Sequence, residues 1–260
     1  GQGGHFPAMV ESSVTTSALV QLARAAGAAI MEHYHESIEV EQKADRTPLT
    51  LADRASHTAI VSGLEALDPL TPVISEEGIV PDYEVRQSWP RFWLVDPLDG
   101  TREFIKRNGE FTVNICLIEG GEPVLGVVSA PAMDTVYWAA RGEGSWRQRG
   151  RGTPERIYST PCDQTRPVTI VESRSHPSPE LEHYLGTLTV SRRVRIGSSL
   201  KFCSVAEGTA DLYPRLGPTM EWDVAAGDCV FRYSARTGQR HSPLTYNKPD
   251  LRNERVIIGL

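Results

Sequence analysis

The sequence predicts a mixed fold with two subdomains, in which an α+β half is followed by an α/β half. In the first half, two helix-like segments precede a series of short apolar segments separated by Gly and Pro turns. In the second half, short strand-like and helix-like segments alternate. Between the halves, residues 141–167 are rich in Gly, Arg and Pro and have little periodicity. We therefore expect subdomains at residues 10–160 and 161–260.

The first half is expected to combine two helices with a mostly antiparallel sheet. Apolar side chains recur at helical spacing over residues 17–34. A second helix should follow the turn at Thr47-Pro48-Leu49 and end at Asp68-Pro69. Strands are expected at residues 38–43, 72–74, 92–95, 111–118, 124–130 and 135–140.

The second half is expected to alternate strands with helices. Strands are predicted at residues 168–171, 194–196 and 210–216. Helices are predicted at residues 178–185, at 200–207 and from Glu221 through Cys229.

Composition and charge exclude several classes of function. The net charge of −6 is unfavourable for a binder of nucleic-acid polymers. No apolar run approaches the roughly 20 residues of a membrane span. The N-terminal residues lack the pattern of a secretory signal, and the four cysteines form no CxxC pair. We expect a reduced, cytoplasmic setting. Peripheral attachment to the cytoplasmic face of the inner membrane stays open, as does the choice between monomer and homodimer.

Acidic residues cluster where predicted strands end or helices begin, which is where sites form in α/β proteins. The clusters are Glu76, Asp96 with Asp99, and Asp223. Two carboxylates 4 Å apart repel by about 4 kcal/mol at an effective dielectric constant near 20. Gathered together, these groups require a cation, and ligands that are all oxygen favour Mg²⁺ or Mn²⁺ over zinc.

The segment Asp96-Pro97-Leu98-Asp99-Gly100-Thr101 can hold both a metal and a phosphate. Pro97 fixes the chain between the two aspartates, and Gly100 permits close approach of the backbone to a ligand. A helix beginning at Thr101 would offer free N–H groups to an anion. The alternative is an ordinary Asp-Gly turn capped by Asp99.

Three motifs resemble those of the inositol monophosphatase-like family of metal-dependent phosphomonoesterases. They are Glu76-Glu77, Asp96-Pro97-Leu98-Asp99-Gly100-Thr101 and Trp222-Asp223-Val224-Ala225-Ala226-Gly227. Within this family, residues 43–50, 101–112 and 197–203 are most similar to the bacterial 3′(2′),5′-bisphosphate nucleotidases of sulfur assimilation. The resemblance implies a layered α-β-α-β-α sandwich and sensitivity to lithium.

The resemblance also implies roles for individual residues. Two or three Mg²⁺ ions, for which Mn²⁺ could substitute, would be held by Glu76, Asp96, the Leu98 carbonyl, Asp99 and Asp223. Asp53 and Thr101 would form the pair that orients and activates the attacking water. By the sequence alone, a helix-capping role for Asp53 is favoured, and the resemblance favours the catalytic role instead.

The substrate is expected to contact the metal-binding segment and a second region. The substrate-binding candidates are Glu76, Leu98, Asp99, Gly100, Thr101, Ser199, Lys201 and Asp223. Lys201 stands at the start of a predicted helix, where a positive charge suits a second phosphate; its alternative is a solvated surface lysine. Arg215 is a weaker phosphate candidate.

The implied activity is hydrolysis of adenosine 3′,5′-bisphosphate to AMP and phosphate by a metal-activated water. The 3′-phosphate of 3′-phosphoadenylyl sulfate is a further expected substrate. One alternative is the same chemistry on an inositol or sugar phosphate, and another is a non-catalytic regulatory module that binds nucleotide or metal. An aspartyl-nucleophile phosphatase is disfavoured, because two residues rather than one separate Asp96 from Asp99.

Overall fold

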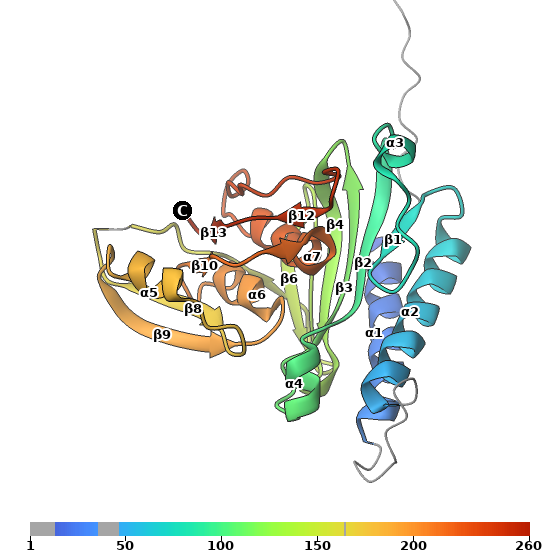
Figure 1. The fold of residues 1–260 in the computed structure, drawn as a ribbon, viewed down its shortest axis with the longest axis horizontal. Helices are drawn as coiled ribbons and strands as arrows, with labels where there is room; N and C mark the ends of the chain where they lie inside the picture. Colours follow the sequence, from blue (N-terminus) through green and yellow to red (C-terminus); the bar gives the residue numbers. More distant parts are fainter. Residues whose placement is uncertain (1–13, 36–46, 164) are drawn as a thin grey trace, which may run out of the picture.

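The computed structural model describes residues 14–35, 47–163 and 165–260. Its elements form five layers (Figure 1). Helices α1 (Thr16–Tyr34) and α2 (Pro48–Leu67) cover one face of a large sheet. Helices α6 (Leu200–Ala206) and α7 (Glu221–Arg232) cover the other face. A smaller sheet and then α5 (Pro179–Leu185) complete the predicted α-β-α-β-α sandwich.

The large sheet has seven strands in chain order, from β1 to β7. Only β1 and β2 run parallel, so the prediction of a mostly antiparallel sheet is confirmed. The strands are β1 Val73–Ser75, β2 Arg91–Asp99, β3 Thr112–Glu119, β4 Glu122–Ala130, β5 Thr135–Ala140, β6 Gly144–Arg149 and β7 Glu155–Ile157.

The two faces of this sheet build two separate cores because successive side chains of a strand point to opposite faces. On β3, Ile115 and Leu117 pack towards α1 and α2, whereas Cys116 and Ile118 pack towards α6 and α7. Helices α1 and α2 begin close to the predicted positions, and each has a threonine cap. The hydroxyl of Thr15 accepts the Ala18 N–H, and that of Thr47 accepts the Thr50 N–H.

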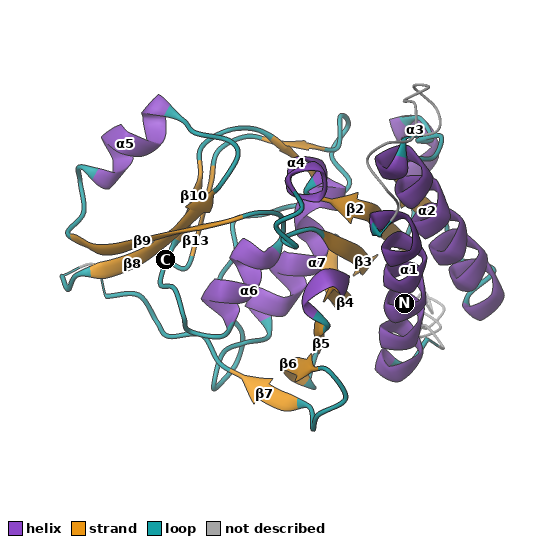
Figure 2. Ribbon diagram, turned by 90° about the horizontal axis from the view of Figure 1, so that it is seen from below, coloured by secondary structure: helices purple, strands orange, loops and turns teal. Residues whose placement is uncertain are grey.

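The second half contributes short paired strands (Figure 2). Strands β8 (Val168–Ser173) and β9 (Val190–Ile196) are parallel. Strand β10 (Tyr213–Arg215) pairs with β13 (Val256–Ile258), and β11 (Thr219–Met220) pairs with β12 (Arg252–Asn253). The remaining short helices are α3 (Tyr83–Arg86), α4 (Thr101–Lys106) and the 3₁₀ turn η1 (Pro131–Met133).

Some expectations about elements were wrong or lie outside the described residues. Residues 141–167 contain β6 and β7, although glycines and arginines hide their alternation. Strand β9 begins at residue 190 rather than 194. The strand expected at 38–43 lies outside the described residues. The division at residue 160 stays a prediction.

Buried Arg86 fastens the segment after β1 to the C-terminal region. Its guanidinium donates to Asn247 Oδ1 (2.7 Å) and to the carbonyls of Lys248 (2.9 Å) and Pro249 (2.6 Å). The buried carboxylate of Glu221, the first residue of α7, accepts the N–H groups of Asn247 (2.6 Å) and Lys248 (3.0 Å). The start of α7 is therefore tied to α3.

None of the described helices combines the length and the apolar character that a membrane span requires.

Candidate active site

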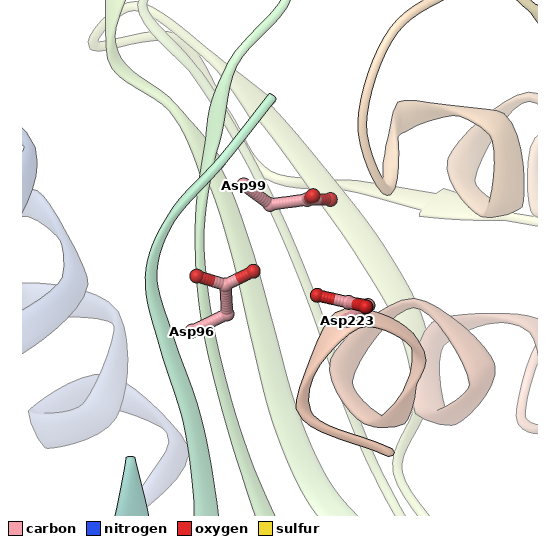
Figure 3. A group of neighbouring side chains, drawn as sticks. All are labelled: Asp96, Asp99 and Asp223. Atoms are coloured by element: carbon pink, nitrogen blue, oxygen red, sulfur yellow. The ribbon is translucent and has the colours of Figure 1, made fainter. Parts of the chain in front are cut away.

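Two neighbouring aspartates and a third that is distant in the sequence meet at the end of β2 (Figure 3). Asp96 and Asp99 lie at the end of β2, and Asp223 lies in the first turn of α7. One carboxylate oxygen of each lies within 4.8 Å of those of the other two. This group can hold a metal ion, and it brings together acids from both halves of the chain.

Local structure explains how β2 presents two carboxylates to one point. The pairing of β2 with β3 is irregular between Asp96 and Asp99, which alters the simple alternation of side chains. The Leu98 N–H donates to Asp96 Oδ1 (3.3 Å), and the buried Ser56 hydroxyl donates to the Pro97 carbonyl (2.7 Å). Asp223 is oriented by the Met220 N–H, which donates to its Oδ2 (2.8 Å).

Gly100 allows the chain to turn from β2 into α4. Its φ of +91° is in the left-handed region, which disfavours residues with a side chain. A Cβ there would lie 3.0 Å from the Glu110 carbonyl oxygen and 3.2 Å from Ser198 Cβ. The sequence-based interpretation assigned this glycine to ligand approach, but the structure shows that packing against the protein's own backbone also requires it.

Crowding of the carboxylates raises their pKa values. Burial is the largest cause for Asp99, whose pKa rises to about 7; Asp223 adds to the rise, while Lys201 and the Ser199 N–H oppose it. Burial and then the charges of Asp99, Glu76 and Asp223 raise the pKa of Asp96 well above its usual range. The pKa of Asp223 is also raised, mainly by burial. Without a cation, these groups resist ionising together.

Glu76 and Asp53 extend the acidic region. Glu76 follows β1 and is exposed as a residue, but partial burial of its carboxylate raises its pKa, and it shares a hydrogen bond with Asp96. Burial, followed by the charges of Glu77 and Glu76, raises the pKa of Asp53 to about 7. Asp53 Oδ1 is buried and has no hydrogen-bond partner among the described residues.

These observations fit a hard divalent cation. The donors are all oxygen atoms, which suits Mg²⁺ or Mn²⁺. The raised pKa values mark negative charge that the protein does not itself neutralise. An isolated buried oxygen such as Asp53 Oδ1 is costly unless a cation or water satisfies it.

The aspartates, called here the acidic wall, and the cationic side chains Lys201, Arg215 and Arg102, called here the cationic wall, line one cavity of about 320 Å³. Glu76, Leu98, Gly100, Thr101 and Ser199 also line it. Lys201 is 5% exposed, and burial lowers its pKa to about 8 although Asp99 favours its charge. The alternative of a solvated surface lysine is therefore wrong. Arg215 and Arg102 line the same cavity.

His176 also lines this cavity, and sequence reasoning missed it. It follows β8 in a Ser-Arg-Ser-His-Pro segment that matches no motif, so only the fold reveals its position. Burial and then the charges of Arg215, Arg102 and Lys201 lower its pKa. Because this shift favours the neutral imidazole, His176 adds a hydrogen-bonding group rather than a positive charge to the cavity.

Two predicted roles have geometry that differs from the expectation. The structure records no hydrogen bond between Asp53 and Thr101, both of which are described, so their pairing stays a prediction. Ser199 is 2% exposed, and its hydroxyl contacts Thr112 and Asn114 rather than pointing only into the cavity.

Comparison with known proteins identifies the family. The family profile described as the inositol monophosphatase family matches residues 11–255. This chain belongs to the inositol monophosphatase family. Among members of the family, a 3′(2′),5′-bisphosphate nucleotidase CysQ of Escherichia coli is 55% identical over 212 residues, covering 81% of this chain and 84% of the relative. A protein of the same name from Haemophilus influenzae is 34% identical over 230 residues, covering 87% and 85% of the two chains.

Solved structures of the inositol monophosphatase family have the same fold. CysQ from Bacteroides thetaiotaomicron superposes with a TM-score of 0.80 at 42% identity, covering 93% of this chain and 95% of that one. SuhB of Mycobacterium tuberculosis gives a TM-score of 0.67 at 28% identity, covering 83% and 82%. The predicted family and layered sandwich are confirmed.

Proposed function

We propose that the protein is a Mg²⁺-dependent 3′(2′),5′-bisphosphate nucleotidase that hydrolyses adenosine 3′,5′-bisphosphate to AMP and phosphate. The 3′-phosphate of 3′-phosphoadenylyl sulfate is a second proposed substrate. One observation carries this proposal: a single cavity is lined both by carboxylates that could hold a metal ion and by the cationic side chains of Lys201, Arg215 and Arg102. A substrate with two separated phosphates matches both walls.

The acidic wall would receive the phosphate that is cleaved. Glu76, Asp96, Asp99, Asp223 and the Leu98 carbonyl would hold two or three Mg²⁺ ions. When bound, these ions would supply the positive charge that activates water and stabilises the departing oxygen. Hydrolysis of phosphate monoesters is extremely slow without catalysis, so charge stabilisation of this kind is needed.

The chain itself would position the attacking water and accept its proton. Asp53 suits this role because a pKa of about 7 matches a base that operates near neutral pH. Thr101 lines the cavity at the start of α4, where its hydroxyl could relay an orienting hydrogen bond from Asp53.

The cationic wall would receive the second phosphate. Lys201, Arg215 and Arg102 belong to it, and Arg215 Nε is buried without a hydrogen-bond partner among the described residues. A smaller adjoining cavity of about 100 Å³ shares His176 and Arg215 with the larger cavity. Pro177, Leu181, Pro214 and Leu216 give that cavity an apolar lining suited to the flat ring of a nucleobase.

The nearest alternative is an inositol or sugar phosphatase with the same acidic wall. Such a substrate need carry only one phosphate, so it would leave the buried charge of Lys201 without a function. A purely regulatory binding module is less well supported, because the raised pKa of Asp53, beside the acidic wall, suits a catalytic base.

A phosphate-release panel tests the proposal. Adenosine 3′,5′-bisphosphate, 3′-phosphoadenylyl sulfate, inositol 1-phosphate and fructose 1,6-bisphosphate are compared with and without Mg²⁺. We expect the two nucleotides to have the highest kcat/KM, and all release to stop in EDTA. Higher kcat/KM on inositol 1-phosphate would favour the alternative, and nucleotide binding without release would favour the regulatory module.

Asp99→Asn should reduce turnover at least a thousandfold while the protein stays folded, because the variant keeps the side-chain shape but removes a charge that holds metal. Asp250→Asn is the matched control at an exposed site. Retained activity in Asp99→Asn would refute the metal role.

A further inference from the structure

Three polar side chains beside the metal-binding aspartates are almost entirely buried and hydrogen-bonded to one another. They are Thr112 (0% exposed), Asn114 (1%) and Ser199 (2%), called here the polar triad. Thr112 and Asn114 lie on β3, and Ser199 is the residue immediately before α6. The triad therefore joins the large sheet to the helix layer of the second half.

The contacts within the triad leave little freedom to Ser199. Its hydroxyl donates to Asn114 Oδ1 and lies 2.9 Å from the Thr112 hydroxyl. Asn114 Nδ2 in turn donates to the Thr112 carbonyl (3.2 Å) and hydroxyl (3.1 Å). Each side chain is held by the other two, so the network is specific in geometry.

The sheet register places the triad directly against the aspartates. Thr112 is the cross-strand partner of Asp99, and Asn114 is the partner of Asp96. Ser199 and Asp99 line the same cavity, and the backbone of Ser199 favours the ionised form of Asp99. The triad therefore links β3 to the turn that lies beside the group proposed to hold metal.

The turn that carries Ser199 needs such support. Ser198 has a φ of +58°, a left-handed conformation that is unfavourable for a serine. The same turn packs against Gly100, where Ser198 Cβ would lie 3.2 Å from an added Cβ. Without the triad, this turn could relax and move away from Gly100 and Asp99.

We propose that Asn114 and Thr112 are positioning residues for the metal centre, which act by holding the turn that carries Ser199 against Gly100 and the neighbouring Asp99. This inference rests on the proposed function. Groups that orient a metal ligand typically change metal affinity 10–100-fold when they are removed. The triad should therefore control how tightly metal binds more than how fast bound substrate reacts.

Direct metal titration tests this role. Metal is removed with EDTA, and Mn²⁺ is titrated while the free ion is followed by electron paramagnetic resonance. We expect Asn114→Ala to weaken Mn²⁺ binding about tenfold and Thr112→Val, which keeps the side-chain shape, to weaken it severalfold. In kinetics, the Mg²⁺ concentration for half-maximal rate should rise, and saturating Mg²⁺ should restore most of kcat.

Ser145→Ala is the matched control, because it removes a fully buried hydroxyl that donates to the Val230 carbonyl away from the cavity. It should lower the unfolding temperature but leave Mn²⁺ binding within twofold of wild type. If Asn114→Ala does not fold, Thr112→Val decides the question.

Two failures can be distinguished. If both triad variants bind Mn²⁺ as wild type does, the triad is only structural and the inference is overturned. If the wild-type protein itself fails to bind Mn²⁺, the proposed metal centre is wrong, and the inference fails with it.

Discussion

Lys201 shows how a single side chain can favour binding of a phosphate group in the cavity. Its ammonium group is buried, donates to the Ile196 carbonyl (3.3 Å) and lies 5.5 Å from the centre of the Tyr213 ring. Burial lowers its pKa to about 8, and Asp99 offsets part of that effect. A positive charge held in so little water is a strong partner for a phosphate.

Lys201→Gln should therefore raise KM for adenosine 3′,5′-bisphosphate at least tenfold. KM for 3′-AMP, which lacks the second phosphate, should change less than threefold. Wild-type KM for the bisphosphate should also rise above pH 8, where the lysine loses its proton. Initial-rate kinetics over pH 6–9 measure all three effects. Arg192→Gln, which removes an exposed positive charge, should change none of them. An equal rise in KM for both nucleotides in Lys201→Gln would contradict this role.

At the scale of elements, the end of β2 is the most constrained segment of the site. It supplies two aspartates, carries the irregular pairing with β3 and turns through Gly100 into α4. Gly142 has a similar φ of +80° but has open space around its missing side chain. Substitutions at these two glycines can therefore separate the cost of the left-handed backbone from the cost of close packing.

Gly142→Ala should lose about 1 kcal/mol of unfolding free energy from the left-handed backbone alone. Gly100→Ala should lose roughly 2 kcal/mol or more, because its Cβ would also press on the Glu110 carbonyl. Gly100→Ala should reduce kcat as well, since the shift reaches Asp99. Urea unfolding and kinetics check both results, and equal losses of stability would show that packing at Gly100 is unimportant.

The elements that sequence predicted well are those with a strong apolar pattern. Helices α1 and α2 and strands β3 to β5 have long periodic segments, and their cores follow that pattern. Strand β9 was underestimated because Arg192, Arg193 and Arg195 are exposed and charged. Strands β12 and β13 were missed because segments of two or three residues are too short to show a periodic apolar pattern.

In the molecule as a whole, several acidic side chains are gathered where burial and mutual repulsion disfavour their ionisation. Asp96, Asp99, Asp223, Glu76 and Asp53 all have raised pKa values in the folded chain. A raised pKa means that the folded state binds protons more tightly than the unfolded state does. The stability that these groups contribute is then complete at low pH and is lost as pH rises through the folded pKa.

Metal-free protein should accordingly lose stability between about pH 4 and pH 8, with much of the change near pH 7 for Asp53 and Asp99. Saturating Mg²⁺ should raise the unfolding temperature most at pH 8, because the carboxylates are then ionised and able to bind it. Thermal unfolding at pH 5.5 and 8, with Mg²⁺ or EDTA, measures this. An unfolding temperature without Mg²⁺ that is the same at both pH values would contradict the electrostatic account.

Sequence reasoning predicted the acidic wall better than the cationic wall. The aspartates stand in short motifs at strand and helix ends, where local chemistry points to a metal. His176 and the polar triad have no such motif, and their importance depends on the packing of β8, β3 and α6 around one cavity. The oligomeric state, the cytoplasmic location and peripheral membrane attachment stay predictions.

The hydrogen bonds of the Arg86 guanidinium connect two distant parts of the chain beside the site. They brace the segment that follows Glu76 against the loop that holds the first turn of α7. On the α4 side of the cavity, Arg102 and Lys106 hold the buried Ser175 through partly buried hydrogen bonds. Glu76 and Asp223, which come from distant parts of the sequence, are linked through Arg86 and the loop at residues 247–249, so a change in that loop should be felt at the acidic wall.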